Sequence, residues 1–419
     1  MRVIADLHIH SHYSRATSKE MNIEELCYYA KRKGINLLGT GDFTHPLWLK
    51  EIEEKLIETE SNSGIYSYKG MYFVLSGEVS LVYTQDKKVR KVHLVILSKS
   101  FDDVKEINEF LEKKTNLKAD GRPTIEISCP EFVEKIIEIS KDNFIFPAHA
   151  WTPWFGIFGS KSGFDSIKEC FQDQEKNIHA IETGLSSDPE MNWRLSSLDR
   201  FTLLSNSDAH SPWSSRIGRE CNVFEMKEIS YKELIKIIKE KDTKKFLFTI
   251  EVDPAYGKYH YDGHRNCNVS LDPKESMKLN NICPVCKKQL TIGVLHRVEE
   301  LADRPRGFIP KNAIPFIKIL PLTELIAKKY KLNLFSKKVF EIEEKFISRF
   351  GSELATLLDA KEEELAEVDK NLVDLIIKNR EGKLTIIPGY DGVYGELIID
   401  EKIIERGIKR SEKSIEDFI

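Results

Sequence analysis

Asp6-Leu-His-Ile-His-Ser11 decides how the rest of the sequence is interpreted. The stretch ends an apolar run, residues 3–8, whose valine, isoleucine and leucine are typical of a buried β-strand. Side chains two positions apart in a strand point to the same face, so His8 and His10 are presented together. Two imidazoles on one face are suited to bind one metal ion. Alone, the His-x-His pattern is only a weak indication of a metal site.

Six further apolar runs follow, and each has a metal-ligating residue type at or near one end. The runs cover residues 37–42, 72–78, 92–97, 144–149, 180–183 and 203–208, and helical apolar spacing in residues 23–33 and 130–140 lies between some of them. The ligand types that they carry are Asp42, His45, Glu78, His93, His149, Glu182, Asp208 and His210. Alternating strands and helices predict an α/β fold, and in an α/β barrel the strand ends converge on one mouth.

Convergence would turn these scattered residues into one metal site. Each residue singly could instead cap a strand or lie hydrogen-bonded in the core. The whole ordered set is harder to explain in that way, because buried ionisable groups are unfavourable unless they are paired or bind metal. Mixed nitrogen and oxygen ligands suit zinc, manganese or iron, and Glu78 could bridge two ions. We expect several divalent ions, with zinc, manganese or magnesium as candidates, and catalytic roles for His10, Glu78 and Asp208.

Three motifs carry a resemblance to a known family. Asp6-Leu-His-Ile-His-Ser11, Ser76-Gly-Glu78 and Asp208-Ala-His210 resemble those of the PHP (polymerase and histidinol phosphatase) domain. The resemblance implies a distorted seven-stranded α/β barrel over residues 1–250, with a multinuclear centre bound by His8, His10, Glu78, His93, His149, Asp208 and His210. This sequence has Gly41-Asp-Phe-Thr-His45 where the family usually has Thr-Asp-His, so whether Asp42, His45 or both bind metal stays open.

Arg15 is a further candidate catalytic residue, and the five tryptophans are the candidate substrate-binding residues. Arg15 follows the first motif and could clamp a phosphate, but an exposed arginine without such a role is an equal alternative. The tryptophans all follow motif strands, where they could form an aromatic collar that stacks on bases or wedges into a duplex. They could equally anchor long loops onto the barrel. They are Trp48, Trp151, Trp154, Trp193 and Trp213.

Residues 251–310 differ in composition and carry two close pairs of ligand residues. His264-x-x-Cys267 and Cys283-Pro-Val-Cys286 are joined by a loop, as tetrahedral coordination of one structural zinc ion requires. His260 or His296 could replace His264. A zinc site stabilises a small fold that lacks a large core. We therefore predict a small zinc-ribbon-like module here.

The remainder, residues 311–419, has mainly helical apolar spacing. Within it, Pro388-Gly-Tyr-Asp-Gly-Val-Tyr-Gly395 is rich in turn-forming residues and indicates a loop that either lies close against a backbone or reverses the chain. Near the end, Ile415, Phe418 and Ile419 have the hydrophobic spacing of a sliding-clamp-binding tail. A frayed terminus is an equal alternative.

Composition limits these interpretations. A chain of 419 residues is expected to form two or three domains. With 41% hydrophobic residues and no long apolar run, the sequence argues against a membrane span, and we expect a cytoplasmic protein with reduced cysteines. A net charge of −4 counts against nucleic-acid binding, which normally rests on basic residues. Bound divalent ions would offset part of that charge locally.

The PHP motifs, the zinc module and the run Leu295-His-Arg-Val-Glu-Glu-Leu-Ala-Asp-Arg304 together resemble the endonuclease Q family over most of the chain. The resemblance implies cleavage of DNA on the 5′ side of a deaminated base (hypoxanthine, uracil or xanthine) or an abasic site, by a metal-hydroxide mechanism and with the lesion extruded. Two alternatives stay open. A small-molecule phosphatase of the histidinol phosphatase type would share the metal site. A non-catalytic DNA-binding protein would keep only the zinc module.

Overall fold

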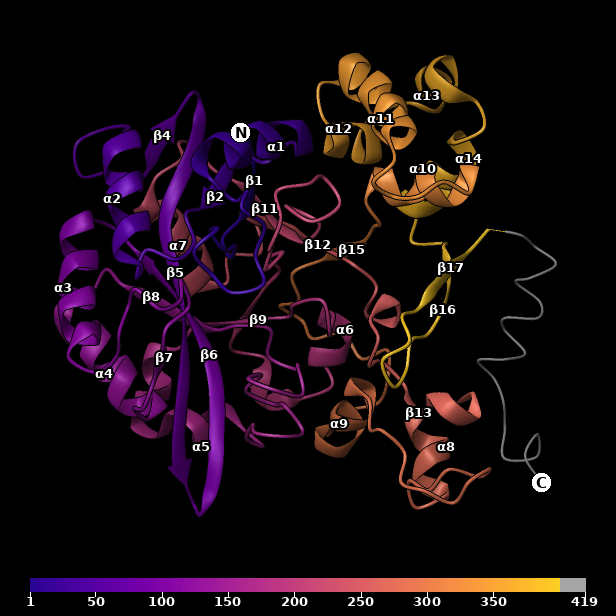
Figure 1. The fold of residues 1–419 in the computed structure, drawn as a ribbon, viewed down its shortest axis with the longest axis horizontal. Coiled ribbons are helices and arrows are strands. Elements are labelled where there is room, and N and C mark those ends of the chain that lie inside the picture. Colours follow the sequence, from indigo (N-terminus) through magenta and orange to yellow (C-terminus); the bar gives the residue numbers. More distant parts are fainter. Residues whose placement is uncertain (400–419) are drawn as a thin grey trace.

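The computed structural model of the protein describes residues 1–399. A mixed 11-stranded sheet dominates the part of the chain drawn in indigo and magenta. The last helices lie beside it at the upper right of Figure 1, and residues 251–310, here called the zinc-ligand segment, lie at the lower right. The predicted clamp-binding tail at Ile415, Phe418 and Ile419 lies outside the described residues. None of the described helices is long and apolar enough to cross a membrane.

All seven predicted strands are present. They are β1 (Arg2–Asp6), β2 (Leu37–Gly39), β5 (Met71–Gln85), β6 (Lys88–Ser98), β8 (Phe144–Pro147), β9 (Ala180–Glu182) and β10 (Thr202–Leu204). Strands β1, β2 and β5 run parallel, β6 runs antiparallel to β5 and β8, and β9 and β10 form a separate parallel pair. The predicted α/β fold class is confirmed.

Backbone hydrogen bonds just beyond the strand ends link these two groups of strands. The Ala150 amide donates to the Glu182 carbonyl over 2.9 Å, which joins the end of β8 to β9. The Asp208 amide donates to the His8 carbonyl over 3.0 Å, which joins the segment after β10 to the segment after β1. The links follow the order of a seven-stranded ring, although closure of the barrel stays a prediction. The two links bring the ends of β9 and β10 close to the ends of β8 and β1.

Further strands extend the sheet. Strands β11 (Cys221–Glu225), β12 (Phe246–Glu251) and β15 (Phe316–Lys318) continue it beyond β1, and β3 (Ile57–Glu58), β4 (Tyr66–Tyr68) and β7 (Thr124–Ile125) lie on the side of β5. Two short hairpins lie outside it, β13 (Asp262–His264) with β14 (Val269–Leu271) and β16 (Thr385–Ile387) with β17 (Glu396–Ile398).

Helices accompany the strands of the first half. Helix α1 (Ile23–Lys33) begins where the Asn22 side chain accepts a hydrogen bond from the Glu25 amide and ends at Gly34, whose φ of 100° suits glycine. The others are α2 (Pro46–Lys55), α3 (Phe101–Glu112), α4 (Cys129–Ile139), α5 (Ile167–Phe171), α6 (Pro189–Asn192) and α7 (Tyr231–Glu240). The predicted helical segments 23–33 and 130–140 correspond to α1 and, shifted by one residue, to α4.

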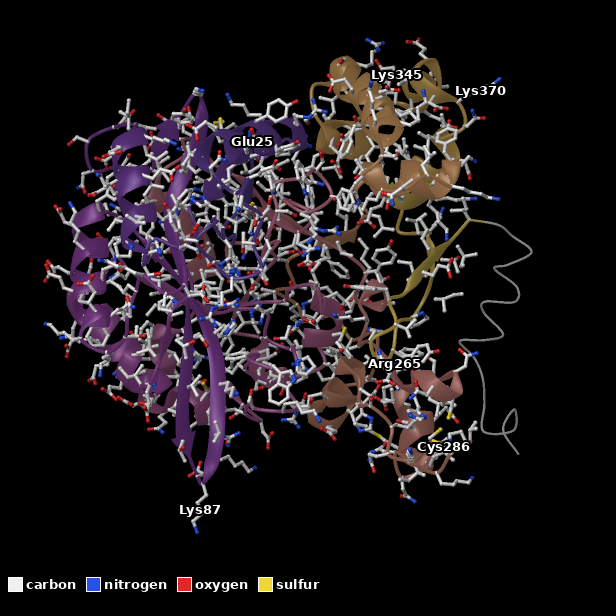
Figure 2. The ribbon with its side chains drawn as sticks, in the orientation of Figure 1. Glu25, Lys87, Arg265, Cys286, Lys345 and Lys370 are labelled. Atoms are coloured by element: carbon white, nitrogen blue, oxygen red, sulfur yellow. The ribbon has the colours of Figure 1, made fainter. Side chains whose placement is uncertain are left out.

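Strands β5 and β6 continue beyond the sheet as a long two-stranded arm (Figure 1). They stay paired from Leu75 opposite Ser98 to Gln85 opposite Lys88. Asp86 and Lys87 form the turn with φ of 51° and 62°, the left-handed conformation that tight hairpins need. Lys87 lies at the far end of the arm (Figure 2).

The zinc-ligand segment lies in the chain between two strands of the main sheet, because β12 precedes it and β15 follows it. It contains α8 (Pro273–Lys278) and α9 (Val294–Leu301). After β15 come α10 (Leu322–Tyr330), α11 (Lys337–Phe350), α12 (Glu353–Leu358), α13 (Glu362–Asp369) and α14 (Val373–Arg380). The last region is thus mainly helical, as predicted, but it also supplies a strand to the main sheet. Domain boundaries at 250 and 310 stay predictions.

A buried ion pair fastens the last helices to the first half. Lys33 Nζ, at the end of α1, lies 2.8 Å from Glu353 Oε1 at the start of α12 and donates to the Ser214 carbonyl over 2.8 Å. Both charged side chains are fully buried. Breaking such a pair leaves an unpaired buried charge, which is strongly unfavourable. The pair therefore favours one arrangement of α1 and α12.

Candidate metal centre

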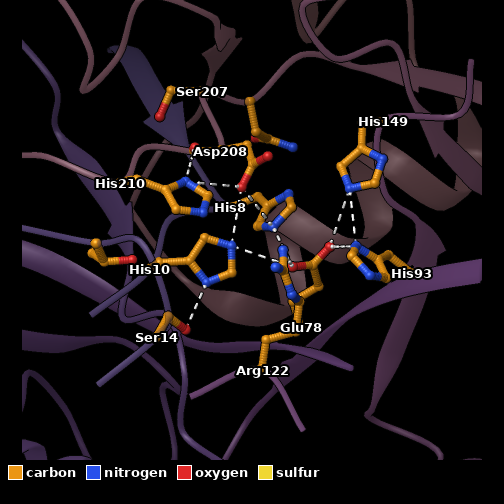
Figure 3. A network of polar contacts seen from close by, with 12 residues as sticks. His8, His10, Ser14, Glu78, His93, Arg122, His149, Ser207, Asp208 and His210 are labelled. Carbon is orange, nitrogen blue, oxygen red and sulfur yellow. Dashed lines mark hydrogen bonds and ion pairs between the residues drawn. The ribbon is translucent and has the colours of Figure 1, made fainter. Parts of the chain in front are cut away.

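Four predicted ligands lie close together in the structure. His8 and His10 follow β1, Glu78 lies within β5 and Asp208 follows β10, and their side chains point toward one another (Figure 3). His10 Nε2 lies 3.2 Å from Glu78 Oε2 and 3.0 Å from Asp208 Oδ1. His8 Nε2 lies 3.6 Å and 3.7 Å from the same two oxygens. Nitrogen and oxygen atoms gathered in this way could share one metal ion.

Glu78 also belongs to a second group of ligand atoms. Its other oxygen, Oε1, lies 2.8 Å from His93 Nδ1 and 3.3 Å from His149 Nε2. His93 comes from within β6, opposite Ser80 of β5, and His149 follows β8. Glu78 thus presents one oxygen to each group, as a carboxylate that bridges two ions does.

Several atoms of these groups are buried without a hydrogen-bond partner. They are His8 Nε2, His10 Nε2, Glu78 Oε1 and Asp208 Oδ1. Such atoms are unfavourable in a folded protein unless another group satisfies them. Imidazole nitrogens and carboxylate oxygens are donors that divalent first-row metals accept readily. The residues therefore fit the predicted metal ions.

Neighbouring charges keep the two central carboxylates ionised. Burial alone would raise the pKa of Glu78, but the contact with His93 and the positive charge of Arg122 outweigh it and hold that pKa well below its usual range. Burial also opposes ionisation of Asp208, yet the nearby imidazole of His10, whose Nε2 lies 3.0 Å from Asp208 Oδ1, lowers its pKa. For His93, burial lowers the pKa to about 4, so its ring is neutral at pH 7 and able to bind metal.

Backbone conformation contributes to the placement of these side chains. Asp42, His149 and Asp208 have φ of 45°, 28° and 47°. This left-handed region is unfavourable for residues with a Cβ and persists at functional sites where the surroundings enforce it. The three residues follow β2, β8 and β10, so this backbone conformation occurs just beyond a strand end in each case.

Asp42 and Glu182 lie behind the histidines and not among the grouped ligand atoms. Asp42 Oδ1 lies 2.9 Å from His10 Nδ1, and its other oxygen accepts hydrogen bonds from Ser11. Glu182 Oε1 lies 3.1 Å from His8 Nδ1, and its Oε2 accepts the His149 amide hydrogen. One oxygen of each carboxylate contacts an imidazole and the other accepts hydrogen bonds from Ser11 or the His149 amide, so a ligand role for Asp42 and Glu182 stays a prediction. Carboxylates in such positions orient metal-binding histidines.

An asparagine substitution tests whether Asp42 binds metal directly or only orients His10. We expect Asp42→Asn to weaken metal binding about 10- to 100-fold and to retain activity at high metal concentration, because the variant loses only the orientation of His10. Asp208→Asn should instead lose activity at every metal concentration. Titration of phosphodiesterase activity with Mn²⁺ measures both variants. If excess Mn²⁺ fails to restore Asp42→Asn, Asp42 is itself a ligand.

The remaining two predicted ligands lie at the edge of the site or away from it. His210 Nδ1 lies 3.7 Å from Asp208 Oδ1, and the side chain is about one-third exposed. It is thus beside the first group without belonging to it. His45 precedes α2 and stacks on Tyr13 with ring centroids 4.1 Å apart. His45 therefore lies outside both groups of ligand atoms, unlike the expectation from its motif.

Arg122 is the residue beside the site that the sequence analysis missed. Its Nη1 donates to Glu78 Oε2 over 3.0 Å, and a quarter of its side chain is exposed. It precedes β7, whose pairing with β5 carries it to Glu78. Arg15, the predicted phosphate clamp, is 79% exposed and pairs with Asp120 at 3.2 Å. Arg122 therefore contacts a predicted metal ligand directly, whereas Arg15 pairs with Asp120.

The tryptophans do not form the predicted collar. Trp48, Trp151 and Trp193 are buried, and the first two donate from Nε1 to the Gly41 carbonyl and to Asn192 Oδ1, so they anchor loops. Trp213 is half-buried and packs edge-on against a tyrosine. Trp154 alone among the five is strongly exposed, at 56%.

The segment that carries Trp154 is tied to two of the predicted metal ligands. Thr152 Oγ1 lies 2.8 Å from His149 Nδ1 and donates to the Trp154 carbonyl over 3.0 Å. The His93 amide donates to the Phe155 carbonyl over 2.9 Å. The backbone that carries Trp154 is therefore held beside the metal centre.

The second predicted metal site is also assembled. Ligand atoms of His264, Cys267, Cys283 and Cys286 all lie within 4.8 Å of one another. His264 Nδ1 and Cys286 Sγ are 3.3 Å apart, and Cys286 lies in the segment beside α8 (Figure 2). His296 does not replace His264, because it is buried with its Nδ1 2.5 Å from Asp262 Oδ2. One imidazole and three thiols in this arrangement fit tetrahedral zinc.

Comparisons with known proteins add to this picture. A family model described as the MJ0043 C-terminal domain matches residues 321–383. The chain is 34% identical over 264 residues to the uncharacterized protein MJ0043 of Methanocaldococcus jannaschii, which covers 61% of this chain and 32% of that protein. The chain thus spans about a third of the length of that curated relative.

Two solved structures are similar over the whole chain. The crystal structure of the lesion-specific endonuclease PfuEndoQ from Pyrococcus furiosus has a TM-score of 0.87 and 34% identity, and the match covers 100% of this chain and 98% of that one. The crystal structure of endonuclease Q with a 27-mer duplex substrate, which has an abasic lesion at the active site, has a TM-score of 0.85 and 34% identity over 100% of both chains.

Proposed function

This chain belongs to the endonuclease Q family, and on that premise we propose that it is a metal-dependent, lesion-specific DNA endonuclease. The finer proposal is that it hydrolyses the phosphodiester on the 5′ side of hypoxanthine, uracil, xanthine or an abasic site. The observation that carries the proposal is the cluster formed by His8, His10, Glu78 and Asp208. Each of these side chains has a buried nitrogen or oxygen atom without a hydrogen-bond partner. The related structure with an abasic-lesion duplex supports DNA as the substrate.

The side chains of the site have separable tasks in this proposal. Bound divalent ions would supply hydroxide near neutral pH and stabilise the charge that develops on the phosphate. Glu78 holds the two ligand groups at a fixed separation, because its two oxygens face one group each. Arg122 is partly exposed beside Glu78, and its guanidinium is suited to donate hydrogen bonds to a phosphate oxygen. It would thereby orient the scissile phosphate.

A cleavage assay tests the proposal directly. The full chain is incubated with manganese or magnesium and end-labelled duplexes that carry inosine, uracil, an abasic site or no lesion, and the cut is mapped. We expect metal-dependent cleavage on the 5′ side of the lesion and an intact undamaged duplex. Uncut DNA with every lesion and metal would contradict the proposal. Hydrolysis of histidinol phosphate without DNA cleavage would indicate the small-molecule phosphatase instead.

Trp154 gives a prediction about substrate binding. We expect Trp154→Ala to weaken binding of the lesion duplex about tenfold, because an exposed aromatic ring can stack on an unpaired base. Trp154→Phe should keep most of the affinity, since it retains an aromatic face. Fluorescence anisotropy with a labelled abasic duplex measures all three proteins. Equal affinities for Trp154→Ala and the unmodified chain would show that the ring does not contact DNA.

A further inference from the structure

Residues 388–395 lie close against the backbone of residues 255–261. The amides of Gly389, Gly392 and Gly395 donate to the carbonyls of Ala255, Lys258 and Tyr256 over 2.9, 2.9 and 3.1 Å. A Cβ on Gly389 or Gly395 would come within 2.2 Å or 2.1 Å of a carbonyl oxygen, so only glycine allows this approach. Of the two alternatives left by the sequence, the loop lies close against a backbone. It therefore holds the last hairpin, β16 and β17, on the zinc-ligand segment.

The contact between residues 388–395 and 255–261 is called the junction below. It presents a small group of aromatic and basic side chains, Lys258, Tyr259 and Tyr394, which we call the tyrosine–lysine patch. Tyr394 is 68% exposed and Tyr259 is 39% exposed. Lys258 Nζ lies 5.6 Å from the centroid of each ring, so the amine is shared between the two. Arg265 reaches the same loop at Gly392. Within residues 1–399, neither Lys258 nor the Arg265 guanidinium forms an ion pair.

Tyr394 joins the patch to a pocket that is also lined by residues from the first half of the chain. Tyr394 lines a pocket of about 900 Å³ together with Arg216 and Arg219, which come from the first half of the chain. On that side, Arg219 donates to the carbonyl of Ser207 over 3.2 Å, directly before Asp208. Arg219 thus contacts the segment next to the metal centre and lines the same pocket as Tyr394.

We propose that Lys258, Tyr259 and Tyr394 form a nucleic-acid contact surface for the part of the DNA substrate that lies outside the metal centre. This inference rests on the proposed function. Phosphates and bases occur side by side in DNA. In the patch, the Lys258 amine is suited to bind a phosphate, and the exposed tyrosine rings are suited to stack on bases. An acidic protein surface would match the cation but would leave the tyrosine rings without a role. The fixed backbone of the junction holds these groups in place before DNA binds.

The test measures DNA affinity in the full-length chain. Asp208→Asn serves as the parent so that DNA is bound without being cut, and the probe is a fluorescein-labelled abasic duplex at several salt concentrations. We expect Tyr394→Ala in this parent to weaken binding about tenfold and Tyr394→Phe to stay close to the parent. Lys258→Gln should reduce the slope of log affinity against log salt by about one, because one phosphate contact is lost.

A matched control lies elsewhere on the surface. Tyr28 on α1 is 53% exposed, with Arg32 Cζ 5.4 Å from its ring, so Tyr28→Ala removes a similar aromatic–cation pair outside the patch. Its affinity should equal that of the parent. Zinc content and thermal unfolding of each variant show whether the junction is still folded.

Two different outcomes overturn two different claims. If the unmodified chain cuts lesion DNA but Tyr394→Ala and Lys258→Gln bind like their parent, the contact surface is wrong and the proposed function stands. If the unmodified chain neither binds nor cuts lesion DNA, the proposed function itself fails. Equal weakening by Tyr28→Ala would also overturn the contact surface, because the effect would not be local.

Discussion

Glu78→Gln is expected to reduce the single-turnover rate of lesion cleavage by at least about 10³-fold. Among the described residues, Glu78 is the side chain that presents an oxygen to each ligand group. Glutamine has the same shape, but its amide nitrogen cannot bind a cation, and the negative charge that offsets the two ions is lost. Single-turnover cleavage of an abasic duplex and the metal content of the purified variant measure the effect.

Glu251→Gln is the matched control for a buried glutamate. Glu251 accepts hydrogen bonds from Thr183 and Thr249 and lies outside both ligand groups. Burial raises its pKa to about 8, so it is mostly protonated at pH 7 and an amide replaces it with little change in charge. We expect cleavage close to that of the unmodified chain. If Glu78→Gln cleaves as fast as Glu251→Gln, Glu78 does not bridge two ions.

Cys283→Ser is expected to remove one zinc ion per chain and to unfold the zinc-ligand segment. The buried hydrophobic cluster of this segment is small and consists of Val269, Leu271, Cys283 and Leu290. Structural zinc contributes about 10–16 kcal/mol of binding free energy, which becomes folding free energy in a small module. The loss of one thiolate ligand therefore removes most of what stabilises the segment. Elemental analysis and limited proteolysis between residues 255 and 310 measure the change.

Cys27→Ser controls for the loss of a buried thiol. Cys27 lies in α1 and is far from the zinc ligands in the chain; its thiol donates weakly to the Tyr68 carbonyl over 3.5 Å. This variant should keep its zinc and its resistance to protease. A Cys283→Ser protein with full zinc content and an uncut segment would show that the four ligands do not hold a structural ion.

The sequence predicted the strands and the grouped ligands because both depend on short-range patterns. Apolar runs of strand length reappear as β1, β2, β5, β6, β8, β9 and β10, and residues such as His10 and Asp208 follow directly at their ends. The exact role of a carboxylate was not predictable in this way. Asp42 and Asp208 both follow a strand with positive φ, but only three-dimensional distances show that Asp42 lies behind His10.

Long-range pairing and burial explain what the sequence analysis got wrong. Arg122 reaches Glu78 only because β7 pairs with β5, and no local pattern encodes that pairing. Trp151 and Trp154 follow the same strand three residues apart, yet one is buried and the other exposed. The large apolar area of tryptophan favours burial wherever the fold offers room. A position after a motif strand therefore does not distinguish an anchor from a binding residue.

The place of β15 in the sheet means that the first half of the chain is not a self-contained unit. Residues 316–318 pair with Thr249–Glu251 of β12, although the whole zinc-ligand segment separates them in the chain. A fragment that stops at residue 250 would leave β12 as an open edge, whose unpaired amides and carbonyls invite association with other molecules. It would also lack Lys318, whose Nζ lies 2.8 Å from Asp188. A fragment designed to keep the catalytic half intact must therefore extend past residue 318 and cannot simply be truncated before the zinc ligands.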